Sequence, residues 1–177
     1  MEIPEQWKNR SKHKANEILK EVYGESLNLP VMIKEVIQGY VGDVEIHSRT
    51  DFPFERGVSA FSTRDMERGW FIVLNGNESV ARQRFSAAHE LAHIVLVPNE
   101  PIIVFHSDDD GSWVEKLCDW FAGDILMPEA AVRNVYQYEP FPNVEDIAKL
   151  FRVSKQVAKI QLEHLNLPFR VMPGISF

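Results

Sequence analysis

The chain has 177 residues, of which 45% are hydrophobic and 25% are charged, the composition of an ordinary soluble globular protein. Its formal net charge of −7 argues against a protein whose main task is to grip nucleic-acid phosphates, because such proteins present basic surfaces. A single cysteine excludes an intrachain disulfide. The N-terminus lacks the apolar segment of a signal peptide, and no apolar run is long enough to span a bilayer. We therefore expect one domain in the cytoplasm.

The part of the chain before residue 76 predicts helices and then strands. Apolar residues spaced among charges indicate a helix over 5–23, and a second helix over 31–42 ends near one of its two glycines. Segments rich in β-branched and aromatic residues, bounded by turn residues, predict three strands. These strands are expected at 44–48, 57–63 and 69–75.

Two helices with clearer sequence signals and a final helix pair follow. The first helix begins at a polar cap within 77–79 and is stopped by Pro98. After a loop with three aspartates, the second helix covers 112–126, with Ser112 as its cap and Glu115 in the position of a capping box. The last helices are expected within 143–167.

The helix before Pro98 contains His89-Glu90-Leu91-Ala92-His93, an H-E-x-x-H pattern. Residues four apart lie about 40° apart around a helix axis, so both imidazoles can bind one metal ion. Glu90 is offset by about 100°, which suits a general base better than a ligand. The competing interpretation is an ordinary amphipathic helix, but two histidines and a glutamate among small residues pack poorly against a core without a metal.

A catalytic zinc needs a third protein ligand and one open position. Glu115 is favoured because it lies on a separate helix, and Asp119 follows one turn later on the same face. The Asp119 carboxylate can accept a hydrogen bond from a ligand imidazole and so fix its tautomer. In the alternative interpretation, Glu115 only caps its helix. The other downstream candidates for the third ligand are His106, Asp108, Asp109 and Asp110.

Two longer stretches resemble the ImmA/IrrE family of zinc metallopeptidases. The motif helix reads RQRFSAAHELAHIVL and the later helix reads EKLCDWFAGDILMP, similar to the family patterns R-F-x-x-A-H-E-x-G-H and E-x-x-A-N/D-x-F-A-x-x-L-L-M-P. The similarity covers about residues 12–167. It implies that zinc is held by His89, His93 and Glu115, and that Glu90 is the general base.

Three residues depart from the family pattern. Ala92 stands where glycine is usual, Cys118 where alanine is usual, and Asp124 where glutamate is usual. Alanine is the better helix former, but its methyl group can crowd a neighbouring strand. Cys118 lies on the same helix as Glu115, so its thiolate is an alternative metal ligand. The commoner role of a free cysteine is that of a small core residue.

The elements and the resemblance together predict an α+β fold. It is a mostly helical, zincin-like domain with a small antiparallel sheet of about three strands on the H-E-x-x-H helix, followed by a C-terminal helix pair. We expect one metallopeptidase domain over 1–177, with a core over about 12–138 and a helical extension over about 143–167. The strands at 57–63 and 69–75 are candidate edges for binding an extended peptide by strand addition.

The resemblance also implies a function. A zinc-dependent endopeptidase, with manganese as the alternative metal, would cleave a helix-turn-helix transcriptional repressor and so derepress stress-response or mobile-element genes. The second hypothesis is a non-catalytic regulatory binding module on the same fold, which sequesters a repressor or associates with DNA. The sequence pattern of the final helix pair resembles a helix-turn-helix. The acidity of the chain nevertheless favours a packing role or a protein partner over DNA.

Overall fold

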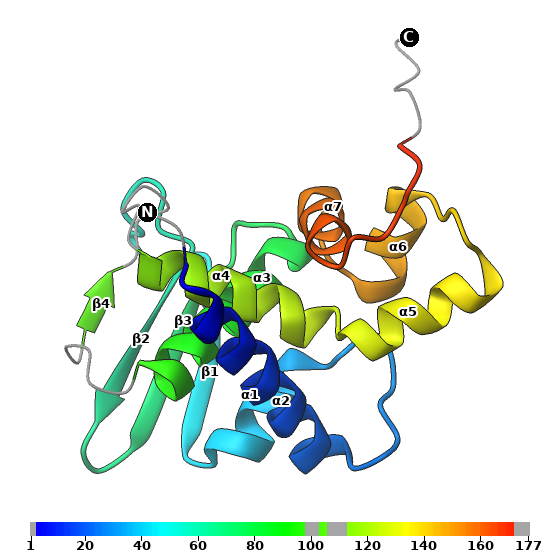
Figure 1. Cartoon of the computed structure of the whole chain (residues 1–177). Coiled ribbons are helices and arrows are strands. Elements are labelled where there is room, and N and C mark those ends of the chain that lie inside the picture. Colours follow the sequence, from blue (N-terminus) through cyan, green and yellow to red (C-terminus); the bar gives the residue numbers. More distant parts are fainter. Residues whose placement is uncertain (1–2, 98–102, 106–112, 172–177) are drawn as a thin grey trace, which may run out of the picture.

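The computed structural model describes residues 3–97, 103–105 and 113–171, and its helices and strands form the predicted α+β fold (Figure 1). The helices are α1 (Glu5–Tyr23), α2 (Ile33–Val41), α3 (Val80–Leu96), α4 (Trp113–Leu126), α5 (Glu129–Tyr138), α6 (Val144–Phe151) and α7 (Lys155–His164). The strands are β1 (Val44–Arg49), β2 (Ala60–Asp65), β3 (Gly69–Asn75) and β4 (Ile103–Phe105). No helix of the described residues is long and apolar enough to cross a membrane.

The sheet differs from the expected antiparallel, three-stranded one. Its order is β1-β3-β2-β4, with β2 antiparallel to both neighbours and β1 parallel to β3. Ile72 and Leu74 are fully buried, which explains the inner position of β3. Between β1 and β2 the chain passes from one side of β3 to the other and reverses its direction. The next strand, β3, returns antiparallel to β2 and therefore runs parallel to β1. β4 lies within a segment that was expected to be a loop.

This strand order also corrects the expectation about peptide binding. Both β2 and β3 have neighbours on each side, so neither can add a peptide strand at an edge. The segments 57–63 and 69–75 therefore do not supply the cleft edge that the sequence predicted.

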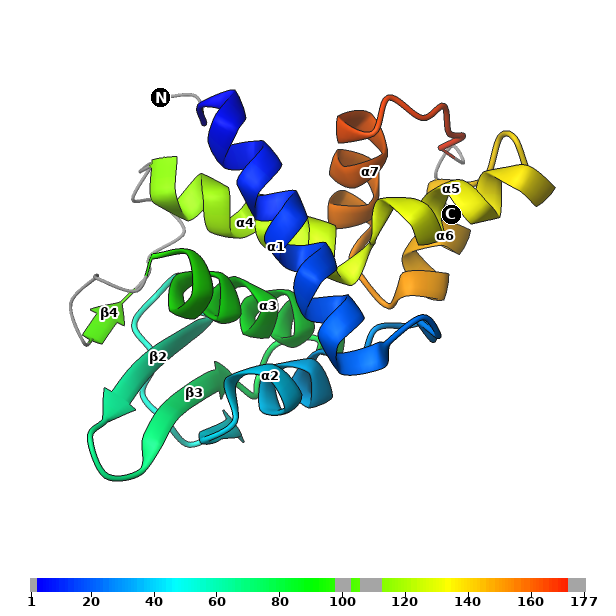
Figure 2. The same cartoon turned by 60° about the horizontal axis from the view of Figure 1, so that its bottom comes forward.

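Helix α3 lies between the sheet and α4, and α1 crosses α4 on the side away from the sheet (Figure 2). The side chain of Ser79 caps α3 by accepting a hydrogen bond of 3.2 Å from the backbone amide of Arg82. Ala87, Ala88 and Ala92 are fully buried, and their small side chains allow α3 to be covered from both sides. The H-E-x-x-H motif is thus held inside the molecule.

The C-terminal helix α7 is fixed to α4 by polar and aromatic contacts. The Gln161 side chain donates a hydrogen bond of 3.0 Å to Asp124 Oδ1. A Cβ at Gly123 would lie 2.7 Å from Gln161 Oε1, so the glycine allows this approach. The rings of Trp120 and His164 stack with centroids 3.7 Å apart. These contacts place one face of α7 beside α4.

Arg84 joins three separate parts of the fold. From α3, its guanidinium donates hydrogen bonds to the carbonyl oxygens of Val31 at 2.8 Å and Arg152 at 3.0 Å. Val31 precedes α2, and Arg152 lies in the turn between α6 and α7. The core helices and the C-terminal helix pair are therefore connected through one partly buried side chain.

Candidate metal centre

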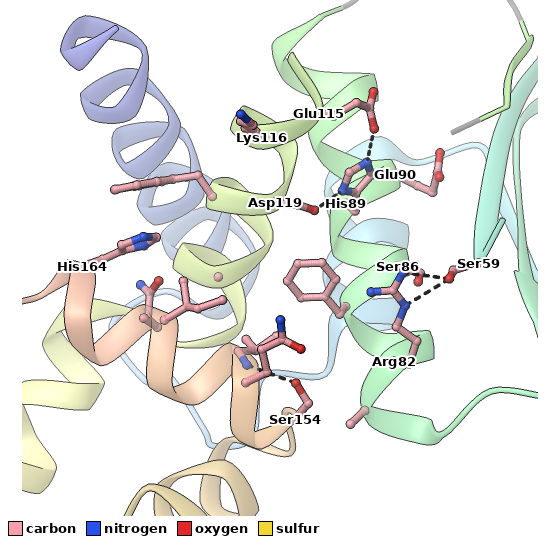
Figure 3. A pocket seen from close by; sticks show the side chains of 18 of the residues that line it. Ser59, Arg82, Ser86, His89, Glu90, Glu115, Lys116, Asp119, Ser154 and His164 are labelled. Atoms are coloured by element: carbon pink, nitrogen blue, oxygen red, sulfur yellow. Dashed lines mark hydrogen bonds and ion pairs between the residues drawn. The ribbon is translucent and has the colours of Figure 1, made fainter. Parts of the chain in front are cut away.

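Three side chains from α3 and α4 bring their donor atoms together. The Nε2 atoms of His89 and His93, one turn apart on α3, are 3.1 Å from each other. Glu115 on α4 places Oε2 at 3.1 Å from His89 Nε2 and Oε1 at 3.4 Å from His93 Nε2. Figure 3 shows Glu115 approaching His89 from the neighbouring helix.

These distances match the geometry that a metal ion requires. In a tetrahedral zinc site with nitrogen and oxygen ligands at about 2.0–2.1 Å, the ligand atoms lie about 3.3–3.4 Å apart. The observed separations of 3.1 and 3.4 Å are close to this value. The set of two imidazoles and one carboxylate also has the chemistry of a catalytic zinc site, which keeps its fourth position open.

Asp119 supports the cluster from one turn further along α4. Its Oδ1 lies 2.9 Å from His89 Nδ1, the ring nitrogen that faces away from Glu115. Burial disfavours a charged imidazole, but the hydrogen bonds to Asp119 and Glu115 and the charge of Glu90 outweigh it and raise the pKa of His89 to about 10. The site therefore attracts a cation, which is a proton when no metal is bound.

Glu90 lies beside the donor set and not in it. Its side chain is only 1% exposed, yet it contributes to the wall of the cleft that contains His89. Ser62 on β2 donates a hydrogen bond of 2.6 Å to Glu90 Oε2. A role for Ser62 was not predicted; its signal in the sequence is the pair of small residues, Ala60 and Ser62, at alternate positions of a predicted strand.

Cys118 offers a second donor set. Its sulfur and the ring nitrogens of His89 and His93 lie within 4.8 Å of one another. Cys118 is fully buried among core residues of α4, whereas Glu115 lines the cleft. The four remaining sequence candidates, His106, Asp108, Asp109 and Asp110, lie outside the described residues, as does the predicted cap Ser112.

The donor set opens into a cleft of about 820 Å³, a volume within the range of ligand-binding sites. One wall carries His89, Glu90 and Glu115, and the opposite side is formed by α7 through residues that include Val157 and Ile160. Figure 3 shows Ser154, which caps α7, and His164, the last residue of α7, across the cleft from His89. From the sequence, the final helix pair was expected to have a packing role or to contact a protein partner; that it borders this site was not predicted.

Comparison with known proteins identifies the family of the chain. The model of the Peptidase_M78 family, described as the IrrE N-terminal-like domain, matches residues 49–163, and the chain belongs to this family. The family resemblance read from the sequence is therefore confirmed, and the matched range includes both α3 and most of α7.

Two individual proteins are similar to the chain. The radiation response metalloprotease IrrE of Deinococcus radiodurans is 28% identical over 96 residues, which cover 46% of this chain and 29% of that protein. A solved structure of a Mycobacterium tuberculosis transcriptional regulator has a TM-score of 0.63 at 14% identity and covers 88% of this chain and 46% of that chain. The second likeness concerns the fold alone. In both cases the chain spans less than half of the other protein.

Proposed function

We propose that the protein is a zinc-dependent endopeptidase, with manganese as the alternative metal, in which His89, His93 and Glu115 hold the metal and Glu90 is the general base. The observation that carries this proposal is the spacing of the three donor atoms, 3.1 to 3.4 Å, beside a buried carboxylate that borders the cleft. Membership of a metallopeptidase family supports it. We further propose that residues 1–177 form one domain that acts in the cytoplasm.

A zinc ion in this site would lower the pKa of a bound water and polarise a peptide carbonyl. Glu90 would take a proton from the attacking water and pass it to the amide nitrogen as the C–N bond breaks. Asp119, bonded to His89 Nδ1, keeps the other ring nitrogen directed at the metal position. A substrate chain bound beside Glu90 and the metal position would also contact the α7 side of the cleft.

The proposed substrate is a helix-turn-helix transcriptional repressor, cut in an exposed segment that can enter the cleft in extended form. Its cleavage would derepress stress-response or mobile-element genes. The family resemblance supports this choice, and the D. radiodurans relative is itself named as a radiation response metalloprotease. DNA is not part of the proposal, since the net charge of −7 opposes phosphate binding.

One observation favours a different function. If Cys118 were a fourth ligand together with Glu115 and the two histidines, no coordination position would be left for water, as in structural zinc sites. The protein would then be a regulatory binding module that sequesters a repressor without cutting it.

The test compares the purified protein with its Glu90→Gln variant on candidate repressors and on peptides derived from them. We expect chelator to abolish cleavage, zinc or manganese to restore it, and Glu90→Gln to lower the rate by about 10²- to 10⁴-fold while metal and repressor still bind. Glu67→Gln, in the exposed turn between β2 and β3, is the matched control and should cleave normally. Metal-independent cleavage, or the same behaviour of Glu90→Gln and wild type, would contradict the proposal.

A further inference from the structure

The backbone of Ser62 is fixed on both sides within the sheet. It pairs with Ile72 of β3 on one side and with Val104 of β4 on the other. Ala60 and Ser62 are buried while Phe61 is not, as expected for alternate residues on the helix-facing side of a strand. The Ser62 hydroxyl is thus held in a rigid part of the molecule and points toward α3.

The contact between Ser62 and Glu90 is short and enclosed. The distance of 2.6 Å from Oγ to Oε2 lies in the range of hydrogen bonds from a hydroxyl to an ionised carboxylate. An ionised carboxylate can only accept, so the hydroxyl donates. Ser62 is 7% exposed and Glu90 1% exposed, so little water can replace this bond if it is lost.

We propose that Ser62 is the positioning residue for Glu90, an inference that rests on the proposed function. The last torsion of a glutamate side chain is broad, so a general base needs an external contact to hold its carboxylate in one orientation. Ser62 engages Oε2 and thereby leaves Oε1 to accept the proton of the attacking water. In this way β2 acts on the reaction through the Ser62 hydroxyl.

Ser48 provides a matched comparison because it is a strand serine whose hydroxyl also bonds to a side chain of α3. From β1, its hydroxyl donates a hydrogen bond of 2.6 Å to Oε1 of Gln83. Neither Ser48 nor Gln83 lines the cleft that contains His89 and Glu90. Loss of the Ser48 hydroxyl therefore removes a sheet-to-helix bond without releasing the proposed general base.

The kinetic test uses the zinc-loaded full chain and a peptide substrate. Ser62→Ala should lower kcat by about 10- to 100-fold, the range found for lost outer partners of metal-site residues, with KM and zinc affinity within about twofold of wild type. Ser62→Thr, which keeps a hydroxyl, should recover most of this loss, and Ser48→Ala should keep kcat within about threefold. In a Glu90→Gln background, Ser62→Ala should change the residual rate no further.

The structural test does not depend on activity. Crystal structures of the zinc-loaded wild type and Ser62→Ala should show Glu90 in one conformation in the first and in several in the second. Wild-type kcat in Ser62→Ala, or an unchanged Glu90 orientation without the hydroxyl, would overturn the inference. If the wild type cleaves no substrate, the proposed function fails, and the two crystal structures still decide whether Ser62 positions Glu90.

Discussion

Helix α4 carries two acidic sites that behave in opposite ways. Near its beginning, Glu115 and Asp119 bond to His89 and raise the pKa of that imidazole to about 10 in spite of burial. Near its end, Asp124 accepts a hydrogen bond from the neutral side chain of Gln161, and burial raises the pKa of the Asp124 carboxyl itself to about 6. The first site holds a positive charge, and the second favours an uncharged acid.

The difference shows that buried carboxylates alone do not define a metal site. Within the described part of the chain, Asp124 Oδ2 is buried without a hydrogen-bond partner, and no imidazole bonds to this carboxylate. At the other end, two histidines of α3 place their nitrogens at ligand distance from Glu115. The following experiments test this contrast, from the largest expected effect on metal binding to the smallest.

Replacement of Glu115 should have the largest effect. Glu115→Gln removes the anionic ligand, and we expect zinc affinity to fall by more than about 100-fold, beyond the range for an outer partner of a ligand. Cys118→Ala, one turn along the same helix, should bind zinc as wild type does. Competition with a chromophoric chelator measures both. Retained affinity in Glu115→Gln with loss in Cys118→Ala would assign the third ligand to the thiolate.

Replacement of Asp119 should have an intermediate effect. Asp119→Ala leaves the three donors in place but removes the partner of His89 Nδ1, so we expect zinc affinity or activity to fall by about 10- to 100-fold. Asp146→Ala, an exposed aspartate on α6, controls for the loss of one negative charge. Equal zinc affinity and activity in the two variants would remove Asp119 from the site.

Acidity should weaken metal binding because zinc must displace the proton on His89. With a pKa of about 10 for His89, isothermal titration at pH 8 in buffers of different ionisation enthalpy should show about one proton released per zinc. The metal-free fold should also lose stability as the pH rises from 6.5 toward 10, because the folded state holds a proton there that the unfolded chain releases. Thermal unfolding in chelator measures this loss, and a flat profile would contradict the raised pKa.

Asp124→Asn should leave zinc affinity unchanged and alter only stability. Folding raises the pKa of this carboxyl from 3.8 to about 6, so the folded state binds more protons and its stability falls as the pH rises through that window. Removal of the charge should therefore stabilise the protein at pH 8 by about 1 to 3 kcal/mol, since one pKa unit corresponds to about 1.4 kcal/mol. Urea unfolding at pH 8 and pH 4 measures the difference, which should vanish at the lower pH.

Local geometry explains which features the sequence could predict. The convergence of His89 and His93 depends only on helical spacing, and the bounds of α1 and α3 follow from apolar periodicity and from caps such as Ser79. These features need no knowledge of distant residues.

The features that the sequence did not predict depend on long-range packing. The Ser62–Glu90 bond joins residues 28 positions apart and requires the observed register of β2 within the sheet. The parallel pairing of β1 with β3 depends on where the chain crosses the sheet. The contribution of α7 to the cleft depends on the fit of Gln161 against Gly123. None of these contacts leaves a periodic signal in the sequence.

The hydrogen bonds of Arg84 have a consequence for the way the chain unfolds. The guanidinium of Arg84 is buried enough to lower its pKa, and its carbonyl acceptors come from both the segment before α2 and the turn between α6 and α7. If the C-terminal helices melted first, this partly buried guanidinium would lose hydrogen bonds worth about 0.5–1.5 kcal/mol each. Calorimetry should therefore record a single cooperative transition, in which the helices beside the cleft and the core beneath it melt together.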